Sequence, residues 1–242
     1  LSADCKILNP EVIHFQFKKL DSVLIAFANE TILVENKKLG YLLHYDLSEF
    51  RYDFINGLIF FQGYPLFEDL KNSASKKVLK KRMDIYEGSV MHFMRSLYTN
   101  KLRENNFEIR QMVKTINIGG KPIIIDGNTK YDNAHKVSFE LTSGVLSADS
   151  VAYGENENTA ALFFKNFLQV TYTKKVPPAY YSRSYNSNGQ GIVSEITLIN
   201  KQPLLVYSNG TYYEPTSLLL SGYWGWSEKI GYLLPFDFTP IK

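Results

Sequence analysis

The chain has 242 residues, of which 45% are hydrophobic and 21% are charged. These shares are close to the averages of soluble globular proteins and exclude a disordered or collagen-like chain. The formal net charge of +3 is small and scattered, and the sequence contains no zinc-finger, helix-turn-helix or RNP pattern, so we expect no nucleic-acid partner.

Cysteine content and hydropathy exclude further classes of protein. The single cysteine, Cys5, excludes a disulfide framework within the chain and any CxxC metal site. No apolar run reaches the length of a transmembrane segment, and no signal-peptide pattern opens the chain. Because the chain begins with Leu rather than Met, we expect it to be part of a longer protein.

The first third of the chain has the pattern of antiparallel strands. Aromatic residues are abundant, with 17 Tyr and 16 Phe, and such side chains favour strands. Between residues 11 and 62, short apolar or alternating runs follow one another, and Asn56-Gly57 joins two of them. Asn-Gly between apolar runs is a strong hairpin signal, because both central turn residues need positive φ.

The hydrophobic period then changes from 2 to 3.6. From about residue 75 to about residue 105, Gly88 is the only glycine or proline, so the pattern predicts one long amphipathic helix. Its basic run, KKVLKKR at 76–82, is typical of a solvated helix start, with contact to a nucleic acid or an anionic lipid as the less favoured alternative.

Strand patterns return from residue 107 onward, interrupted by the Tyr, Ser, Asn and Gly-rich segment AYYSRSYNSNGQG at 179–191, which predicts an exposed loop. The predicted class is α+β and β-rich: mainly antiparallel sheet, sandwich-like or barrel-like, with one long helix at about 75–105. We predict a single domain over 1–242, with a possible subdivision into 1–70, 75–105 and 107–242.

One face of the predicted helix carries candidate catalytic residues. On a helical wheel Val90 lies on the apolar face, whereas His92 lies opposite it with Gly88 and Ser96 one turn to either side. Ser89 and Ser96 are spaced at i−3 and i+4 from His92, as a nucleophile and its base could be. Two alternatives remain: this face packs beneath a second element, which we favour, or it lines a catalytic cleft.

Other catalytic or metal-binding patterns are weak. Glu140 and Glu195 lie in predicted strands and are the candidate carboxylate pair for glycoside hydrolysis. The four histidines show neither HxH nor HExxH spacing, and the loop at 126–133 lacks most ligand positions of a calcium loop. We therefore expect neither a metal nor a cofactor.

Aromatic residues near the C-terminus are the candidate binding residues. Trp224 and Trp226 are two positions apart, so in a strand they would share one face, with Tyr223 on the other. Such a pair could be a sugar-binding platform or, as we favour, part of the core. Tyr181 and Tyr185, in the Tyr-rich segment, add the chemistry common at adaptable recognition surfaces.

Four segments together resemble a known family: CKILNPEVIHF at 5–15, ENKKLGYLLHY at 35–45, YEGSVMHFMRSLY at 86–98 and GYWGWSEKIGYLLPFDFTP at 222–240. They are similar to the C-terminal region of bacterial envelope proteins labelled carboxypeptidase-like regulatory-domain-containing proteins. The resemblance implies an exported protein, periplasmic or associated with the outer membrane, with a signal peptide and a β-sandwich upstream. It implies no peptidase chemistry and supplies no catalytic residue.

From these observations we expect a non-catalytic envelope module that binds a protein or glycan partner. The alternative is a hydrolase of glycan or ester bonds that uses His92 with Ser89 or Ser96, or a carboxylate pair. A structural spacer between envelope components is a third possibility.

Overall fold

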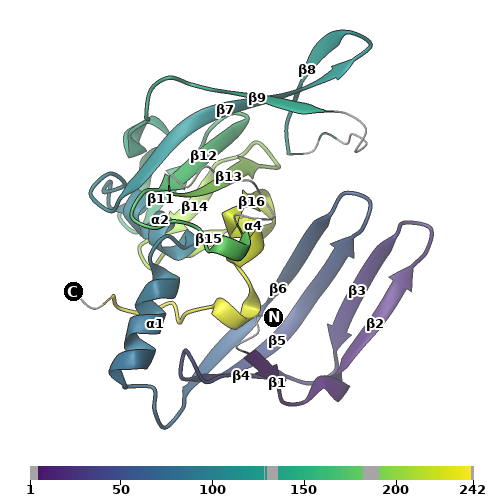
Figure 1. Ribbon diagram of the computed structural model, residues 1–242, viewed down its shortest axis with the longest axis vertical. Coiled ribbons are helices and arrows are strands. Elements are labelled where there is room, and N and C mark those ends of the chain that lie inside the picture. The colour runs from purple at the N-terminus through teal and green to yellow at the C-terminus, as the bar shows by residue number, and fades with distance from the viewer. Residues whose placement is uncertain (1–4, 128, 130–135, 182–190, 241–242) are drawn as a thin grey trace. The chain divides into compact units, whose positions relative to one another are not determined.

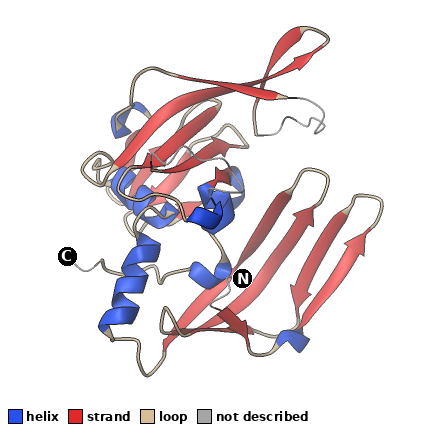
Figure 2. Cartoon of the chain, in the orientation of Figure 1, coloured by secondary structure: helices blue, strands red, loops and turns tan. Residues whose placement is uncertain are grey.

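The computed structural model describes residues 5–127, 129, 136–181 and 191–240. Strands make up 46% of the chain and helices 18%, in three antiparallel sheets with a few short helices, which confirms the predicted β-rich class (Figure 2). The chain divides into two compact units: Leu1–Ile85 with Lys229–Lys242, and Tyr86–Glu228. The boundary between the units, at Ile85 and Tyr86, falls inside the region 75–105 where one helix was predicted. That the chain forms a single domain stays a prediction.

The first unit is built on a six-stranded sheet with the order β1-β4-β5-β3-β2, in which β6 pairs with the free side of β5. The predicted hairpin joins β5 to β6, but through the four residues 54–57, and of Asn56 and Gly57 only Gly57 has positive φ, at +64°. The strands are β1 (Cys5–Ile7), β2 (Ile13–Lys18), β3 (Val23–Ala28), β4 (Ile32–Asn36), β5 (Tyr41–Asp53) and β6 (Leu58–Asp69).

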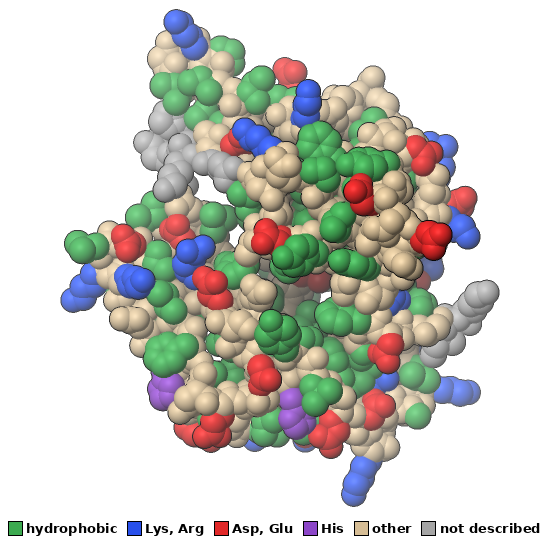
Figure 3. Space-filling model, turned by 180° about the vertical axis from the view of Figure 1, so that it is seen from behind, with side chains coloured by type: hydrophobic (Ala, Val, Ile, Leu, Met, Phe, Trp, Pro, Cys, Tyr) green, Lys and Arg blue, Asp and Glu red, His purple; other side chains and the backbone are tan. Residues whose placement is uncertain are grey.

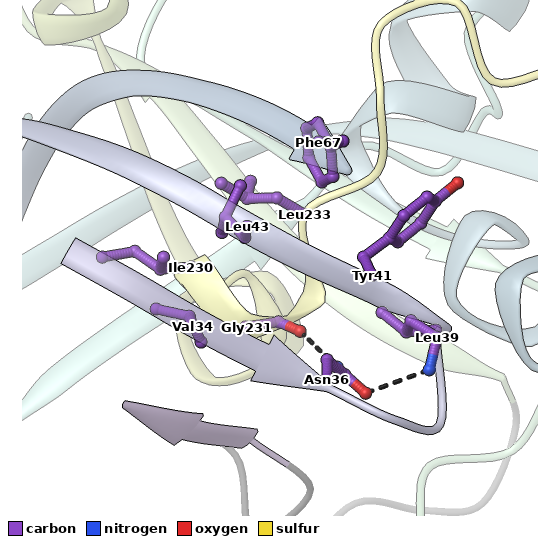
Figure 4. A pocket seen from close by; sticks show the side chains of 9 residues that line it. All are labelled: Val34, Asn36, Leu39, Tyr41, Leu43, Phe67, Ile230, Gly231 and Leu233. Atoms are coloured by element: carbon purple, nitrogen blue, oxygen red, sulfur yellow. Dashed lines mark hydrogen bonds between the residues drawn. The ribbon is translucent and has the colours of Figure 1, made fainter. Parts of the chain in front are cut away.

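One face of this sheet forms the core of the first unit. Val34 and Leu43 lie opposite each other on β4 and β5, and Ile230 and Leu233 of the C-terminal segment pack on the same cluster. The Asn36 amide donates a 2.8 Å hydrogen bond to the carbonyl oxygen of Gly231 (Figure 4). This bond joins the C-terminal segment to the end of β4.

Arg82 shows that the basic run at 76–82 is not wholly solvated. It lies on α1 (Lys76–Tyr86) and is only 8% exposed. Its Nε donates a 2.8 Å bond to the carbonyl oxygen of Leu39, its guanidinium lies 3.7 Å from the ring centre of Tyr41, and it pairs with Asp69 at 2.9 Å. Arg82 therefore holds α1 against the β4–β5 connection.

The prediction of one long helix at 75–105 is wrong. The structure has two helices, α1 and α2 (Val90–Tyr98), separated by residues 87–89, and turns follow α2. Gly88, with φ +83°, ends the first helix, and the Ser89 hydroxyl starts the second by accepting a 3.1 Å bond from the backbone N–H of His92. A glycine with positive φ ends one helix, and an N-cap serine begins the next. Helix propensity alone does not reveal this break.

The second unit contains the other two sheets. A four-stranded sheet has the order β10-β11-β14-β15, and a six-stranded sheet has the order β16-β13-β12-β7-β8, with β9 paired to β7. The strands are β7 (Phe107–Ile118), β8 (Lys121–Ile125), β9 (Val137–Leu141), β10 (Ala152–Asn156), β11 (Thr159–Leu162), β12 (Phe167–Tyr172), β13 (Ile192–Leu198), β14 (Leu204–Tyr207), β15 (Tyr212–Tyr213) and β16 (Leu218–Gly222).

Helix α2 anchors the core of the second unit. Its apolar side chains, including the fully buried Phe93 and Met94, join one cluster with residues of both sheets, such as Ile109 and Leu204. A five-residue helix, α4 (Tyr223–Ser227), follows β16 and belongs to the same unit. In the part of the chain that the structure describes, no helix has both the length and the apolarity to cross a membrane.

Candidate functional site

His92 lies in an aromatic environment at the start of α2. Its ring centre is 4.7 Å from that of Tyr86, 4.9 Å from Phe107 and 5.7 Å from Tyr172. Its Nδ1 accepts a 3.2 Å bond from the backbone N–H of Gly88. Burial lowers the pKa of His92 to about 4, although the nearby Glu87 acts in the opposite direction. The imidazole is therefore neutral at pH 7.

The serines that could have served as nucleophiles bond to the backbone of His92 rather than to its ring. The Ser89 hydroxyl accepts from the His92 N–H, and the Ser96 hydroxyl donates a 2.7 Å bond to the His92 carbonyl oxygen. Ser96 is completely buried and also accepts a 2.9 Å bond from the Asn105 amide. Both hydroxyls therefore satisfy backbone groups of α2, as expected if this helix face packs beneath a second element.

Tyr172 covers this helix face at Gly88. A Cβ atom added at Gly88 would lie 2.8 Å from Cδ1 of Tyr172. The Tyr172 ring is 2% exposed, and its hydroxyl has no hydrogen-bond partner among the described residues. Burial, with Glu87 nearby, raises the pKa of Tyr172 to about 12. The face is packed beneath β12 rather than lining a cleft.

The candidate carboxylates, Glu195 and Glu140, do not come together. Glu195 on β13 pairs with Lys114 and accepts a 3.0 Å bond from Ser221, whereas Glu140 lies on β9. Strands β12 and β7 separate them, which is roughly 14 Å across the sheet at about 4.8 Å per strand. Their registers, Glu195 with Gln169 and Glu140 with Val113, also place them on opposite faces.

The histidines and acidic groups offer no metal site in the described ranges. No group of three His, Cys, Asp or Glu residues is arranged to hold a metal ion there. His14 packs against Phe27, and His44 bonds to Glu68 at 3.0 Å. His135 lies outside the described residues, as does most of the loop at 126–133.

The two tryptophans do not share a face, because they lie on α4 and not on a strand. Residues two apart on a helix point in nearly opposite directions. Trp224 is 1% exposed, and its indole N–H donates a 2.7 Å bond to the carbonyl oxygen of Gly88. Strand β16 ends at Gly222, which has φ +65° and lets the chain turn into the helix. Trp224 is therefore a core residue, which confirms the favoured alternative for it.

Trp226 instead forms the centre of an aromatic cluster with three tyrosines. Its ring centre lies 5.3 Å from Tyr180, 5.3 Å from Tyr181 and 5.4 Å from Tyr223, and Tyr181 lies 5.1 Å from Tyr223. We call these four residues the aromatic cluster. Tyr181 is 6% exposed and Tyr180 is 61% exposed, so the cluster has a buried base and an open rim.

Sequence reasoning named three members of this cluster and missed the fourth. Tyr181, Tyr223 and Trp226 come together, whereas Tyr185 lies outside the described residues. Tyr180 was overlooked although it is adjacent to Tyr181 and follows Pro177-Pro178. Two successive tyrosines after a rigid proline pair were the signal that could have found it.

A carboxylate holds α4 to the start of α2. Glu228 Oε1 accepts a 3.1 Å bond from the backbone N–H of Val90, and the Glu228 N–H donates to the carbonyl oxygen of Trp224. Burial raises the pKa of Glu228 to about 7, although the bond from Val90 opposes the shift. Tyr212 lies nearby, and its pKa is raised to about 12 by burial and then by Glu228.

An ion-pair group fixes the segment that leads to Tyr180. Glu87 pairs with Lys174 at 2.7 Å and with Lys175 at 3.4 Å, and Lys175 also donates to the Glu87 carbonyl oxygen. Burial acts to raise the pKa of Glu87, but the two lysines outweigh it and hold the pKa below its usual value. The Glu87 ion pairs therefore hold the segment that leads to Tyr180 and Tyr181, and the Glu228 bond to Val90 holds the segment that carries Tyr223 and Trp226.

Two hollows are lined by residues of the first unit. One, lined by Val34, Leu43 and Gly231 among others, measures about 10 Å³ and has room for about one water molecule (Figure 4). The other is a shallow depression of about 360 Å³ beside Lys18 and Arg51. Neither includes His92 or the aromatic cluster.

Comparisons with models of protein families, with curated proteins and with solved structures gave no match. The functional argument therefore depends on the geometry of this chain.

Proposed function

We propose that the chain is a non-catalytic cell-envelope module that binds a glycan through the aromatic cluster of Tyr180, Tyr181, Tyr223 and Trp226. The observation that carries the proposal is the position of Trp226, within 5.4 Å of three tyrosine rings, one of which is 61% exposed. Location in the periplasm or at the outer membrane is part of the proposal and follows from the family resemblance.

The chemistry of the cluster suits a sugar. A sugar ring presents an apolar C–H surface together with hydroxyl groups, and tyrosine and tryptophan combine a flat apolar ring with a polar hydrogen-bonding group. Because the buried Tyr181 supports the Trp226 ring, the platform is ordered before a ligand arrives. Such preorganisation reduces the entropy cost of binding.

The absence of catalysis in the proposal is supported by two arrangements. The hydroxyls of Ser89 and Ser96 bond to the backbone of His92, whose ring is neutral and packed among aromatics. Glu140 and Glu195 point to opposite faces of their sheet. These arrangements support a binding role over hydrolysis by these residues.

A protein partner is the second candidate. The exposed Tyr180 and the neighbouring Tyr-rich segment have the composition common at adaptable protein-recognition surfaces. A protein would be expected to engage more than the ring faces, since a specific interface covers roughly 800 Å² on each partner.

An array of glycans and peptidoglycan fragments tests the proposal. We expect the wild-type chain to bind a defined subset of glycans and the Trp226→Ala variant to lose that binding. Tyr64→Ala removes an exposed tyrosine from β6 in the first unit and is the control, which should bind as wild type. The proposal fails if wild type binds no glycan or if Trp226→Ala binds as tightly as wild type.

A further inference from the structure

One face of the first sheet is hollowed where β2, β3 and β5 lie side by side, with β3 in the middle (Figure 1). Lys18 on β2 is opposite Val23 on β3, and Ile25 on β3 is opposite Arg51 on β5. Paired residues share a face, as do residues two apart on a strand, so these four side chains point to the same side. The depression there measures about 360 Å³, which is within the range of small-molecule sites.

Four charged side chains line this depression, two of each sign. Lys18 and Arg51 are the cations, and the anions are Asp21, in the turn 19–22, and Glu49, on β5. Among the residues that the structure describes, none of the four forms an ion pair or a side-chain hydrogen bond. We define the charged depression by six of its residues: Lys18, Asp21, Val23, Ile25, Glu49 and Arg51.

The neighbouring acid, Asp53, is already occupied. It lies opposite Val23, and its carboxylate accepts bonds from the backbone N–H groups of Ile55 and Asn56 and from the Asn56 amide. Figure 3 shows positive and negative side chains interspersed at its left edge, where the hairpins of this sheet end. Two cations and two anions line the charged depression, so a complementary ligand carries charges of both signs.

The width of the charged depression indicates the length of the ligand. Charged side chains of β2 and β5 flank the partly buried apolar side chains of β3, in the order Lys18, then Val23 and Ile25, then Glu49 and Arg51. Two strand spacings of about 4.8 Å place the flanks roughly 10 Å apart. The ammonium and carboxylate groups of a free amino acid are attached to one carbon and do not span this width, whereas an extended chain of two or three residues spans about 7–10 Å.

We propose that the charged depression binds a short peptide of two or three residues with free ends. The C-terminal carboxylate of the peptide pairs with Arg51, because a planar guanidinium can hold a carboxylate through two hydrogen bonds. The N-terminal ammonium pairs with Asp21 on the other side of β3, and an apolar side chain of the peptide lies on Val23 and Ile25. Capture of chain ends is an established mode of peptide recognition.

Other classes of ligand match these charges less well. An uncharged glycan offers no charge to any of the four side chains, and a nucleic acid or another polyanion would be repelled by Asp21 and Glu49. Because all four side chains are exposed, we expect a modest affinity that weakens as salt rises. The proposal does not depend on glycan binding by the second unit.

NMR titration of the isotope-labelled full chain with the tripeptide alanyl-leucyl-alanine tests the proposal. At a pH of about 6.5 the α-amino group of the peptide, with a pKa of about 7.7–8.0, is protonated. We expect the amide signals of Val23, Ile25 and Arg51 to shift when the peptide is added. The N-acetylated and the C-amidated peptides each lack one charge and should bind at least about 10-fold more weakly.

Two variants assign the ends of the peptide. Arg51→Gln removes the partner of the carboxylate, so it should bind the free and the C-amidated peptide alike. Asp21→Asn removes the partner of the ammonium and should bind the free and the N-acetylated peptide alike. Lys71→Gln and Glu30→Gln remove exposed charges that do not line the depression, and both should keep the preference of wild type for the free peptide.

Failure of the free peptide to bind wild type overturns the proposal. Signal shifts confined to the aromatic cluster, or equal binding of free and blocked peptides by wild type, also overturn it. So does a wild-type preference that persists in Arg51→Gln or in Asp21→Asn. Glycan binding is measured separately on the array, so the two proposals fail independently.

Discussion

The indole N–H of Trp224 donates a 2.7 Å hydrogen bond to the carbonyl oxygen of Gly88. The bond joins the helix that carries Trp226 to the break between α1 and α2. Both partners are buried, so the bond holds α4, which carries Trp226, to the start of α2.

Trp224→Phe keeps most of the buried ring and removes this bond. We expect the free energy of unfolding to fall by about 1–3 kcal/mol, because the Gly88 carbonyl oxygen loses its partner in a buried place. Urea denaturation measures the change. Trp226→Phe is the matched comparison and should cost less stability, since Trp226 is only partly buried; the reverse order would contradict the assigned roles.

Gly88→Ala tests the break between the two helices. Alanine at φ +83° is strained, and its Cβ would lie 2.8 Å from the Tyr172 ring. Gly57 is the matched control, because it has φ +64° but no atom within 4 Å of an added Cβ. We expect Gly57→Ala to cost about 1 kcal/mol and Gly88→Ala to cost clearly more. Equal losses would show that Tyr172 does not restrict position 88.

Glu228→Gln should change how stability depends on pH. The pKa of Glu228 is raised to about 7 in the folded chain, so its protonated form favours folding. This contribution is complete below pH 4.5 and is lost as pH rises to about 7, at a cost of up to about 3 kcal/mol. Glutamine can still accept from Val90 and carries no charge.

Denaturation of wild type and Glu228→Gln across this pH range measures the effect. The variant should gain stability relative to wild type as pH rises and should match it near pH 4.5. A difference that does not vary with pH would contradict the raised pKa.

The imidazole of His92 should remain neutral down to a pH of about 4, because burial among aromatic rings disfavours its charged form. A folded-state pKa below the unfolded value means that stability from this group is present above pH 6.5 and lost as pH falls to about 4. A pH titration of the His92 ring protons by NMR measures the pKa directly. A midpoint near 6.5 would show that the ring is solvated.

The sequence predicted the parts of the fold that depend on neighbouring residues. Asn56-Gly57 lies in the turn between the paired strands β5 and β6, where Gly57 has φ +64°. The helix break at Gly88 escaped prediction although its signals are local, since a glycine with positive φ is followed directly by a serine that caps α2.

The candidate site was predicted only in part. Aromatic composition indicated Tyr181, Tyr223 and Trp226, but the opposite directions of Trp224 and Trp226 depend on the left-handed Gly222 that turns β16 into α4. Local pattern identifies which residue types are available, whereas distant contacts decide which of them face solvent.

The most direct test of the central claim is calorimetric titration of the strongest glycan from the array into Tyr180→Ala and Tyr64→Ala. The two tyrosines are similarly exposed, at 61% and 71%, but only Tyr180 belongs to the aromatic cluster. A lost ring contact of about 1.4 kcal/mol weakens binding about 10-fold, so we expect that loss for Tyr180→Ala and wild-type affinity for Tyr64→Ala. Wild-type affinity in both variants would contradict glycan binding at the aromatic cluster.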